Sequence, residues 1–550
     1  MKRCCLGAII VSIPKRPAVY ASGAFDKVIK NATIIDGTGR APRRGDVGIT
    51  GDTITAIGDI SGEQGKTVIQ ASGLHLCPGF IDIHTHSDGR ILACPTADSR
   101  VFQGVTTEVT GNCGSSVVPL KRADIKNDLG EFRELGIRPD WTDVASYFSK
   151  LEQIRISVNH ALLLGQGRLR KNAIGLVDRK LTADELKNVL RAVEEGMDCG
   201  AFGVSTGLEY APGIYTPAEE IASMVRLVAR RDGLYATHLR NEGSGLLEAI
   251  NEAVNVGRET GVRVQISHLK AAGRSNWNKQ TAALGLLEKA RRLGIDVSAD
   301  AYPYTAYSTS LSILLKAWVR EGGTKAILRR LRNRDARRRI RREVSERVGE
   351  SPGDFDLIVI NSTKSERNRT TIGKNLFEIG EMWKVEPVDA LLRLLEEEAT
   401  LVDFVGHGMA PGNVEMVLSH PLVMIGSDGS SMSGQGKAAE ARPHPRSYGT
   451  FPRVLGHYVR ERRLLGLSSA VKKMTSMPAK QLGLADRGRV ARGMKADLVI
   501  FDGAEVRDTA TFEQPHQYPQ GIKHVLVNGI LVVENGKHTG ARPGMILRKT

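Results

Sequence analysis

The chain predicts an α/β fold: a (β/α)8 barrel with a small β-sandwich-like domain built from both termini and a helical insertion. Three observations lead to this prediction. Eight strand candidates alternate with helix-start signals along the middle of the chain, as in parallel βα units. Both ends of the chain instead carry β-hairpin patterns. A length of 550 residues is enough for one large barrel and an accessory domain.

The first 24 residues, 1–24, stand apart from these patterns as an N-terminal extension. Two basic residues precede an apolar stretch at 4–13, and Val19-Tyr20-Ala21 could form the end of a secretory signal peptide. Two further basic residues at 15–16 argue against that interpretation. Residues 1–21 are therefore either the signal peptide of an exported or periplasmic protein or the start of a cytoplasmic one.

A small β domain is predicted from residues 25–78 together with 482–550. In the first part, two alternating runs flank Gly51-Asp52, which has the form of a two-residue hairpin turn. In the second part, two runs flank Asn528-Gly529, the strongest short hairpin signal. We expect the two ends of the chain to join in one accessory sheet.

Residues 79–481 are predicted to form the barrel, and eight strands are the number that a TIM-type barrel needs. The strands are expected at 79–86, 104–110, 158–164, 201–206, 234–239, 262–268, 295–300 and 422–427. Capping boxes at 182–185 and 216–219 mark two helix starts. The stretch from about 317 to 400 is too long for a βα loop, so we expect an inserted helical subdomain over the barrel mouth.

The charge of the chain is strongly basic, with a formal net charge of +16 and a sequence pI of about 9.6. Such a balance permits binding to nucleic acid or to an anionic surface. Much of it, however, lies in an arginine-rich run at 329–347, which has no aromatic residue for stacking on bases. We interpret this run as a solvated helix of open role and expect no nucleic-acid partner. No apolar run approaches the length of a membrane span, and the six cysteines form no C-x-x-C unit.

Side chains that bind metals follow the ends of the predicted strands. Two histidines one residue apart close the first strand, and residues i and i+2 of a strand point to the same face. A cysteine follows the second strand, histidines end the fifth and sixth, and an aspartate ends the eighth. The set is His84, His86, Cys113, His238, His268 and Asp428. Barrel enzymes place their chemistry at this end of the strands, so we expect these side chains to converge.

The chemistry of this set points to a hydrolase. Imidazole nitrogen and thiolate sulfur are the ligands that zinc prefers, whereas magnesium and calcium prefer oxygen. An aspartate beside a metal-activated water can accept its proton and pass it to a leaving group. These are the groups needed to hydrolyse a carbonyl–nitrogen bond.

With these strand-end residues, the chain resembles the amidohydrolase superfamily and, within it, the N-acyl-D-amino-acid deacylases (D-aminoacylases). The resemblance runs from about residue 25 to the C-terminus. It is carried by QGVTTEVTGNCG at 103–114, STGLEYAPG at 205–213, THLRNE at 237–242, SHLK at 267–270, and RPHPR and YGTFPR at 442–446 and 448–453. It implies hydrolysis of a small molecule, an N-acyl-D-amino acid, to a carboxylate and a free D-amino acid.

The resemblance also implies a metal arrangement. Cys113, His238 and His268 would hold one tight zinc ion. His84 and His86, with Cys113 as the shared ligand, would form a second, weaker position.

The remaining roles implied by the resemblance concern proton transfer and substrate binding. Asp428 would act as the general base and later as the acid. Arg446 would bind the substrate α-carboxylate through two parallel hydrogen bonds, for which guanidinium is suited. Lys270, Tyr210 and Tyr302 would help to bind the substrate.

Two other functions fit parts of the pattern. A cyclic-amide hydrolase of the hydantoinase or dihydroorotase kind would need a carboxylated lysine at the end of the fourth strand, and 201–210 contains no lysine. A non-catalytic, amidohydrolase-like binding protein would have lost metal ligands, whereas this chain retains the full set. The preferred side chain, the preferred acyl group and the oligomeric state stay open.

Overall fold

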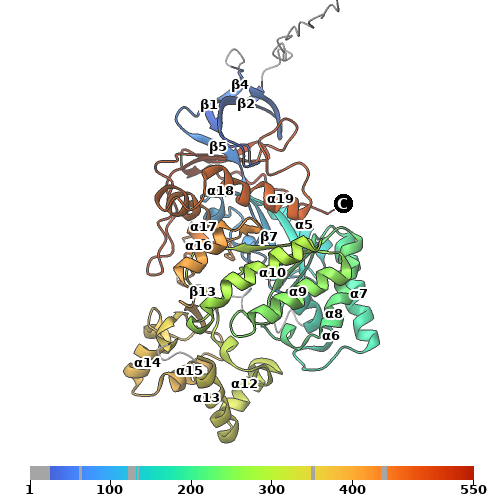
Figure 1. Cartoon of the computed structure of the whole chain (residues 1–550), viewed down its shortest axis with the longest axis vertical. Coiled ribbons are helices and arrows are strands. Elements are labelled where there is room, and N and C mark those ends of the chain that lie inside the picture. The colour runs from blue at the N-terminus through green and yellow to red at the C-terminus, as the bar shows by residue number, and fades with distance from the viewer. Residues whose placement is uncertain are drawn as a thin grey trace, which may run out of the picture.

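The computed structural model describes residues 25–60, 65–121, 132, 135–348, 354–434 and 442–549. The N-terminal extension, with the candidate signal peptide, lies outside the described residues. A small β domain and a helical insertion lie at opposite ends of the long axis, with a barrel between them (Figure 1). The fold class predicted from the sequence is therefore confirmed.

The barrel consists of eight parallel strands, whose order in the sheet follows their order in the chain. They are β6 (Phe80–Asp82), β7 (Val105–Thr110), β8 (Asn159–Gly165), β9 (Gly203–Gly207), β10 (Leu234–His238), β11 (Arg263–Ile266), β12 (Val297–Ala301) and β16 (Val423–Ile425). Each strand overlaps one of the eight predicted runs. Nearly every residue of these strands is buried, because the barrel interior covers one face and the surrounding helices cover the other.

The barrel closes between its first and last strands, just beyond their ends. The backbone N–H of Asp428 donates to the carbonyl of His84 at 2.8 Å, and the N–H of His86 donates to the carbonyl of Gly429 at 2.8 Å. Closure therefore places two histidines and the aspartate of the predicted site on neighbouring backbones.

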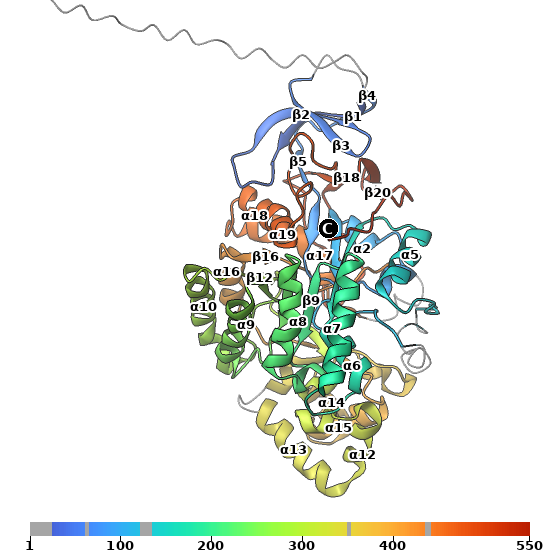
Figure 2. The same cartoon turned by 90° about the vertical axis from the view of Figure 1, so that its right-hand side faces the viewer.

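Helices between the strands cover the outside of the barrel (Figure 2). The longer ones are α5 (Val144–Ile154), α6 (Gln166–Ile174), α7 (Ala183–Asp198), α8 (Ala218–Arg230), α9 (Leu246–Thr260), α10 (Gln280–Arg292), α16 (Pro411–Ser419), α17 (Arg446–Arg453) and α18 (Leu467–Met474). The capping box of Thr182 and Glu185 is formed at the start of α7. The box predicted at Thr216 is wrong: α8 has no side-chain cap, and the Thr216 hydroxyl accepts a hydrogen bond from Gln166 instead.

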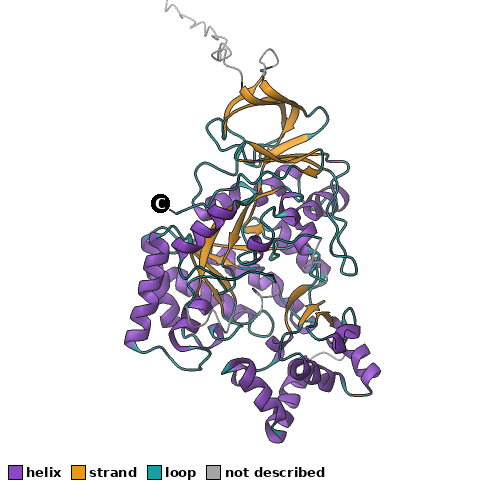
Figure 3. Cartoon of the chain, turned by 180° about the vertical axis from the view of Figure 1, so that it is seen from behind, coloured by secondary structure: helices purple, strands orange, loops and turns teal. Residues whose placement is uncertain are grey.

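The small domain is a nine-stranded mixed sheet to which both ends of the chain contribute. Its strands gather at the end of the molecule that lies away from the insertion (Figure 3). Its strands are β1 (Phe25–Ile34), β2 (Arg43–Thr50), β3 (Thr53–Gly58), β4 (Gly65–Gln70), β5 (His75–Pro78), β17 (Leu498–Phe501), β18 (Ile522–Val527), β19 (Ile530–Glu534) and β20 (Lys537–His538). Both predicted hairpins are present, as β2–β3 and as β18–β19. The two halves of the sheet join where β5 pairs with β17 in antiparallel orientation.

The insertion has a hydrophobic core of its own, separate from that of the barrel. Its main helices are α11 (Ala317–Arg320), α12 (Gly323–Arg332), α13 (Arg334–Val348), α14 (Leu376–Trp383) and α15 (Pro387–Glu397). They pack with a three-stranded antiparallel sheet that the sequence did not predict, made of β13 (Tyr307–Ser310), β14 (Ile358–Ser362) and β15 (Asp403–Gly406).

The arginine-rich run lies on α12 and α13, and several of its side chains are paired within the insertion. Arg341 lies 3.1 Å from Asp389, and Arg337 lies 3.0 Å from Glu396. Arg339 stacks on the Trp318 ring at 4.2 Å. Among the described residues, no helix is both long enough and apolar enough to cross a bilayer.

Candidate active site

The six predicted metal-binding and catalytic side chains meet at one end of the barrel. His84 and His86 follow β6, Cys113 follows β7, and His238 is the last residue of β10. The other two are His268, which follows β11, and Asp428, which follows β16. All are buried except His86, whose side chain is 32% exposed. The carboxyl ends of parallel strands thus bring together residues that are more than 300 positions apart in the chain.

Nitrogen and sulfur atoms of these residues face one another at short range. The Cys113 Sγ lies 3.3 Å from Nε2 of His84 and 3.5 Å from Nε2 of His268. Nε2 of His268 lies 2.9 Å from Nδ1 of His238. Four potential ligand atoms, from His84, Cys113, His268 and Asp428, lie within 4.8 Å of one another. Donors of this kind, so close together and so deeply buried, form a site for a metal ion.

Three of the converging residues have a positive φ angle, a backbone conformation that residues other than glycine rarely adopt. The φ angles are +51° at Cys113, +35° at His268 and +51° at Asp428. Such strain persists where the surrounding structure enforces it, and it is typical of functional sites. The turn that carries Cys113 also needs Gly111, because a Cβ there would lie 1.8 Å from the Leu163 carbonyl oxygen.

Each of three histidines has a carboxylate on the ring nitrogen that faces away from the cluster. Nδ1 of His84 lies 3.1 Å from Asp300, Nδ1 of His268 lies 2.9 Å from Glu242, and Nε2 of His238 lies 3.3 Å from Glu209. Carboxylates in this position fix the tautomer and the orientation of metal-binding imidazoles. The positions of these three carboxylates behind the histidines were not predicted from the sequence, although Glu209 and Glu242 lie inside the motifs at 205–213 and 237–242.

The electrostatics of the cluster favour the ligand form of the cysteine. Burial alone would raise the pKa of the Cys113 thiol, but His84 and His268 outweigh burial and hold that pKa well below its usual range. The thiolate is the form that binds metals.

Asp428 touches both the histidines and a cation. Its Oδ1 lies 3.0 Å from Nε2 of His86 and 3.4 Å from Nε2 of His84, and its Oδ2 lies 2.7 Å from Nη1 of Arg446. Burial would raise the pKa of Asp428, but Arg446 and then the histidines hold it well below the usual range. The carboxylate is therefore ionised and can accept a proton.

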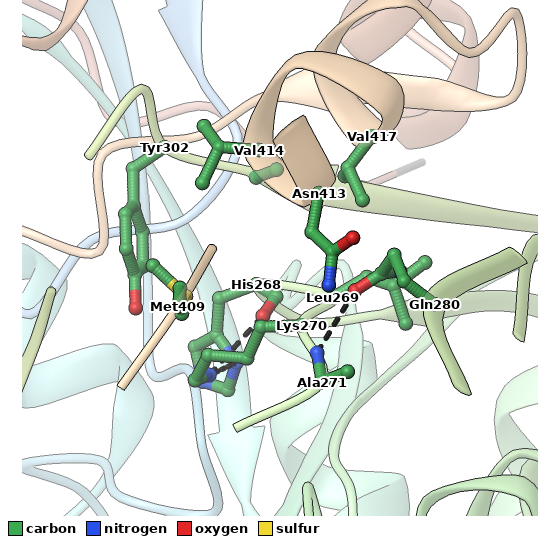
Figure 4. A pocket seen from close by; sticks show the side chains of 11 residues that line it. His268, Leu269, Lys270, Ala271, Gln280, Tyr302, Met409, Asn413, Val414 and Val417 are labelled. Atoms are coloured by element: carbon green, nitrogen blue, oxygen red, sulfur yellow. Dashed lines mark hydrogen bonds between the residues drawn. The ribbon is translucent and has the colours of Figure 1, made fainter. Parts of the chain in front are cut away.

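The residues predicted to bind substrate lie beside this cluster. Nζ of Lys270 lies 2.7 Å from Glu242 and packs against the His268 side chain, and Tyr302 lines the same small pocket (Figure 4). The Tyr302 ring has Arg446 at 5.0 Å and Lys270 at 6.0 Å. The Tyr302 hydroxyl is buried, and it has no hydrogen-bond partner among the described residues. A polar group of a ligand at this point would satisfy it.

A cleft of about 510 Å³, open to solvent, leads to these residues. The barrel lines it with His238, His268 and Asp428, and the insertion lines it with Arg320 and Arg347. Tyr210 also lines it, with its ring 4.7 Å from that of His238 and its hydroxyl 3.1 Å from Thr309. Cys113 and Arg446 are not part of the lining. The cleft can therefore bring a small molecule against the metal-binding cluster.

The amino-acid sequence is similar to known proteins along nearly its whole length. A model of the amidohydrolase family matches residues 386–533. The N-acyl-D-glutamate deacylase of Alcaligenes xylosoxydans xylosoxydans is 37% identical over 525 residues, which are 96% of this chain and 97% of the relative. The D-aminoacylase of the same organism is 36% identical over 538 residues, 96% of this chain and 99% of the relative.

A solved structure is similar over the same extent. It is the crystal structure of the N-acyl-D-glutamate deacylase from Bordetella bronchiseptica, in complex with zinc and a phosphonate inhibitor that mimics the tetrahedral intermediate of the reaction. The TM-score is 0.81 at 34% sequence identity, and the match covers 96% of this chain and all of the other. The similarity therefore spans the small domain, the barrel and the insertion.

Proposed function

This chain belongs to the N-acyl-D-amino-acid deacylase (D-aminoacylase) family of the amidohydrolases, and from that membership we propose the role of each residue at the barrel mouth. The reaction is zinc-dependent hydrolysis of the amide bond of an N-acyl-D-amino acid. Water adds its oxygen to the acyl carbon, the carbon–nitrogen bond breaks, and a carboxylate and a free D-amino acid leave. The convergence of His84, Cys113, His268 and Asp428 below an open cleft is the observation that carries this proposal.

Zinc fits the donor set, because imidazole and thiolate are its preferred ligands. Cys113, His238 and His268 would hold the tight ion. The short distances from His268 to Cys113 and to His238 support this assignment. His84 and His86, with Cys113 shared, would form a weaker second position. A bound zinc ion polarises the acyl carbonyl and activates water.

Asp428 would move the proton. Its Oδ1 faces the cluster, where it would accept a proton from the attacking water and later give it to the leaving nitrogen. Arg446 holds Asp428 in its ionised form, because its charge keeps the pKa of that carboxyl low.

The α-carboxylate of the substrate would bind among Lys270, Tyr302 and Arg446, and Tyr210 would contact the substrate beside His238. Two cations flank the Tyr302 ring, and the Tyr302 hydroxyl lacks a partner. A carboxylate held here while the acyl carbonyl meets the metal leaves one Cα configuration correctly placed.

This placement predicts strict stereochemistry. N-acetyl-D-amino acids should react, and their L-enantiomers should react about a hundredfold more slowly or worse, the scale for a misplaced reacting group. D-substrates with the carboxylate capped as an amide should also be poor. The measurement is kcat/KM for four matched substrates, D and L, each free and capped. Equal rates for all four would contradict both the stereochemistry and the carboxylate site.

Arg446→Lys tests the contact with the carboxylate. The charge stays, but a point charge cannot form two parallel hydrogen bonds, so kcat/KM should fall on the order of a hundredfold. If Arg446 binds the α-carboxylate, the variant should also lose discrimination between free and capped substrates. If both substrates slow by the same factor, Arg446 acts only through Asp428.

Glu242→Gln tests the carboxylate behind His268. We expect the affinity for zinc to fall about tenfold to a hundredfold, because the amide no longer fixes the imidazole tautomer. Competition with a chromogenic chelator measures that affinity. The matched control is Glu220→Gln, which alters a buried carboxylate paired with Arg170 outside the cleft. Equal zinc affinity in the two variants would rule out this role for Glu242.

A further inference from the structure

The wall of the cleft that the insertion provides carries two guanidinium groups beside one carboxylate. Nη2 of Arg347, near the end of α13, lies 2.6 Å from Oε1 of Glu209. Nη1 of Arg320, the last residue of α11, donates to the backbone carbonyl of Glu209 at 2.6 Å. The other carboxylate oxygen of Glu209 faces His238. The two arginines are thus one side chain away from the metal-binding cluster.

The other charged groups deep in the cleft have partners of opposite charge. Lys270 is paired with Glu242, and Asp428 with Arg446, as described above. At the rim, Glu346 lies 3.7 Å from Arg342 and Asp354 lies 3.5 Å from Arg274, so neither neutralises the inner wall. Lys316 lines the cleft but is exposed to solvent.

Arg320 is therefore the buried cation of the cleft that has no carboxylate of its own. It is only 6% exposed, and its Nε has no hydrogen-bond partner among the described residues. It forms no ion pair there, since the one nearby carboxylate, Glu209, is engaged by Arg347. Burial and then the like charge of Arg347 lower the pKa of Arg320, with Glu209 opposing them.

A buried cation without a counter-charge is costly, and an anionic group of a ligand would offset that cost. Guanidinium is suited to a planar carboxylate, which it can bind through two hydrogen bonds. Arg320 lines the same cleft as Lys270 and Tyr302, where the proposed α-carboxylate site lies.

We propose that the wall formed by Arg320 and Arg347 binds a second carboxylate of the substrate, which makes N-acylated acidic D-amino acids the preferred class. This inference rests on the proposed function and adds the side-chain preference to it. A second carboxylate has two chemical sources, the side chain of the amino acid or the acyl group. We favour the amino-acid side chain as the source. Substrates that carry the second carboxylate on the side chain or on the acyl group distinguish these two sources.

The first experiment uses the zinc-loaded protein and pairs of near-isosteric substrates. We expect kcat/KM to be about tenfold or more higher for N-acetyl-D-glutamate than for N-acetyl-D-glutamine, and likewise for D-aspartate over D-asparagine, the scale of a charged hydrogen bond. N-succinyl-D-leucine compared with N-acetyl-D-leucine tests a carboxylate on the acyl group. If kcat/KM rises only for N-succinyl-D-leucine over N-acetyl-D-leucine, the bound carboxylate belongs to the acyl group, and the proposed preference for an acidic side chain is wrong.

The outcomes separate this inference from the function on which it rests. If no N-acyl-D-amino acid is hydrolysed, the proposed function fails. If D-leucine and D-glutamine derivatives react as fast as the D-glutamate derivative, the function stands and the second carboxylate site is wrong.

The second experiment removes the positive charge of Arg320, which has no carboxylate partner among the described residues. In Arg320→Gln the ratio of kcat/KM for the glutamate over the glutamine substrate should fall to about one, and Arg320→Lys should retain part of it. The matched control is Arg330→Gln, because Arg330 also lies in the insertion and donates to backbone carbonyls but does not line the cleft. That variant should keep the wild-type ratio. Zinc content and Tm report whether each variant is folded. An unchanged ratio in a folded Arg320→Gln protein would refute the assignment.

Discussion

Cys113→Ala is expected to release the metal and to remove nearly all hydrolysis. Cys113 contributes the one sulfur of the cluster and lies within 3.5 Å of both His84 and His268, so both metal positions lose a ligand. Loss of a catalytic metal removes several kcal/mol of transition-state stabilisation, which corresponds to about a thousandfold or more in rate. Metal analysis of the purified variant and kcat/KM for an N-acetyl-D-amino acid measure the two effects.

Cys199→Ala is the matched control, since Cys199 is a half-buried cysteine outside the cluster. It should keep both zinc and activity. His238→Ala and His268→Ala should lose zinc as Cys113→Ala does, whereas His84→Ala should keep the tight ion while activity falls. Full zinc retention in Cys113→Ala would contradict the ligand assignment.

Asp428→Asn should preserve the metal and lose the reaction. The amide has the shape of the carboxylate but cannot accept a proton, and general acid–base groups contribute about a hundredfold or more to the rate. Zinc content should remain near that of the wild type, because Asp428 is not proposed as a ligand. Single-turnover rates at saturating substrate measure the chemical step directly.

The matched control for Asp428→Asn is Asp508→Asn, which removes another arginine-paired carboxylate, 3.0 Å from Arg453. It should leave single-turnover rates close to those of the wild type. A rate for Asp428→Asn within a few-fold of the wild type would show that another group carries the proton.

The sequence predicted those parts of the fold that depend on local patterns. The barrel strands are short buried runs between helix-start signals, and both hairpins have two-residue turns, so short windows were sufficient. The three-stranded sheet of the insertion was missed because its strands have only 4–5 residues and pair across long stretches of helix. The Thr216 box failed because a distant side chain, Gln166, occupies the hydroxyl that would have capped the helix.

At the active site, too, the features that depend on local sequence patterns could be predicted, and those that depend on distant residues could not. His84, His86 and Cys113 could be found because they follow recognisable strands, and strand ends in a barrel converge. The carboxylates behind the histidines also lie at or near strand ends, but their partners lie on other strands, so the sequence did not show which ring each one faces. Asp300, for example, meets His84 across 216 positions. Only the closed barrel shows which carboxylate faces which ring.

Arg347 shows why the charge of a segment does not decide its role. The run at 329–347 was interpreted as a solvated face, and ion pairs such as Arg341 with Asp389 fit that interpretation. Its last arginine instead reaches into the cleft and contacts Glu209. Arg341 and Arg347 belong to the same arginine-rich run, but their positions in the folded insertion give them different partners.

The joint sheet of the small domain has a consequence for protein synthesis. Strand β5 ends at Pro78, and its antiparallel partner β17 begins only at Leu498. At translation rates of about 5–20 residues per second, the ribosome needs on the order of tens of seconds to make the intervening chain. During that time the first five strands present an unpaired edge, which is a site for aggregation. The nascent chain should therefore be prone to aggregate until β17 emerges, and a ribosome that stalls before that point would release a protein with an unpaired sheet edge.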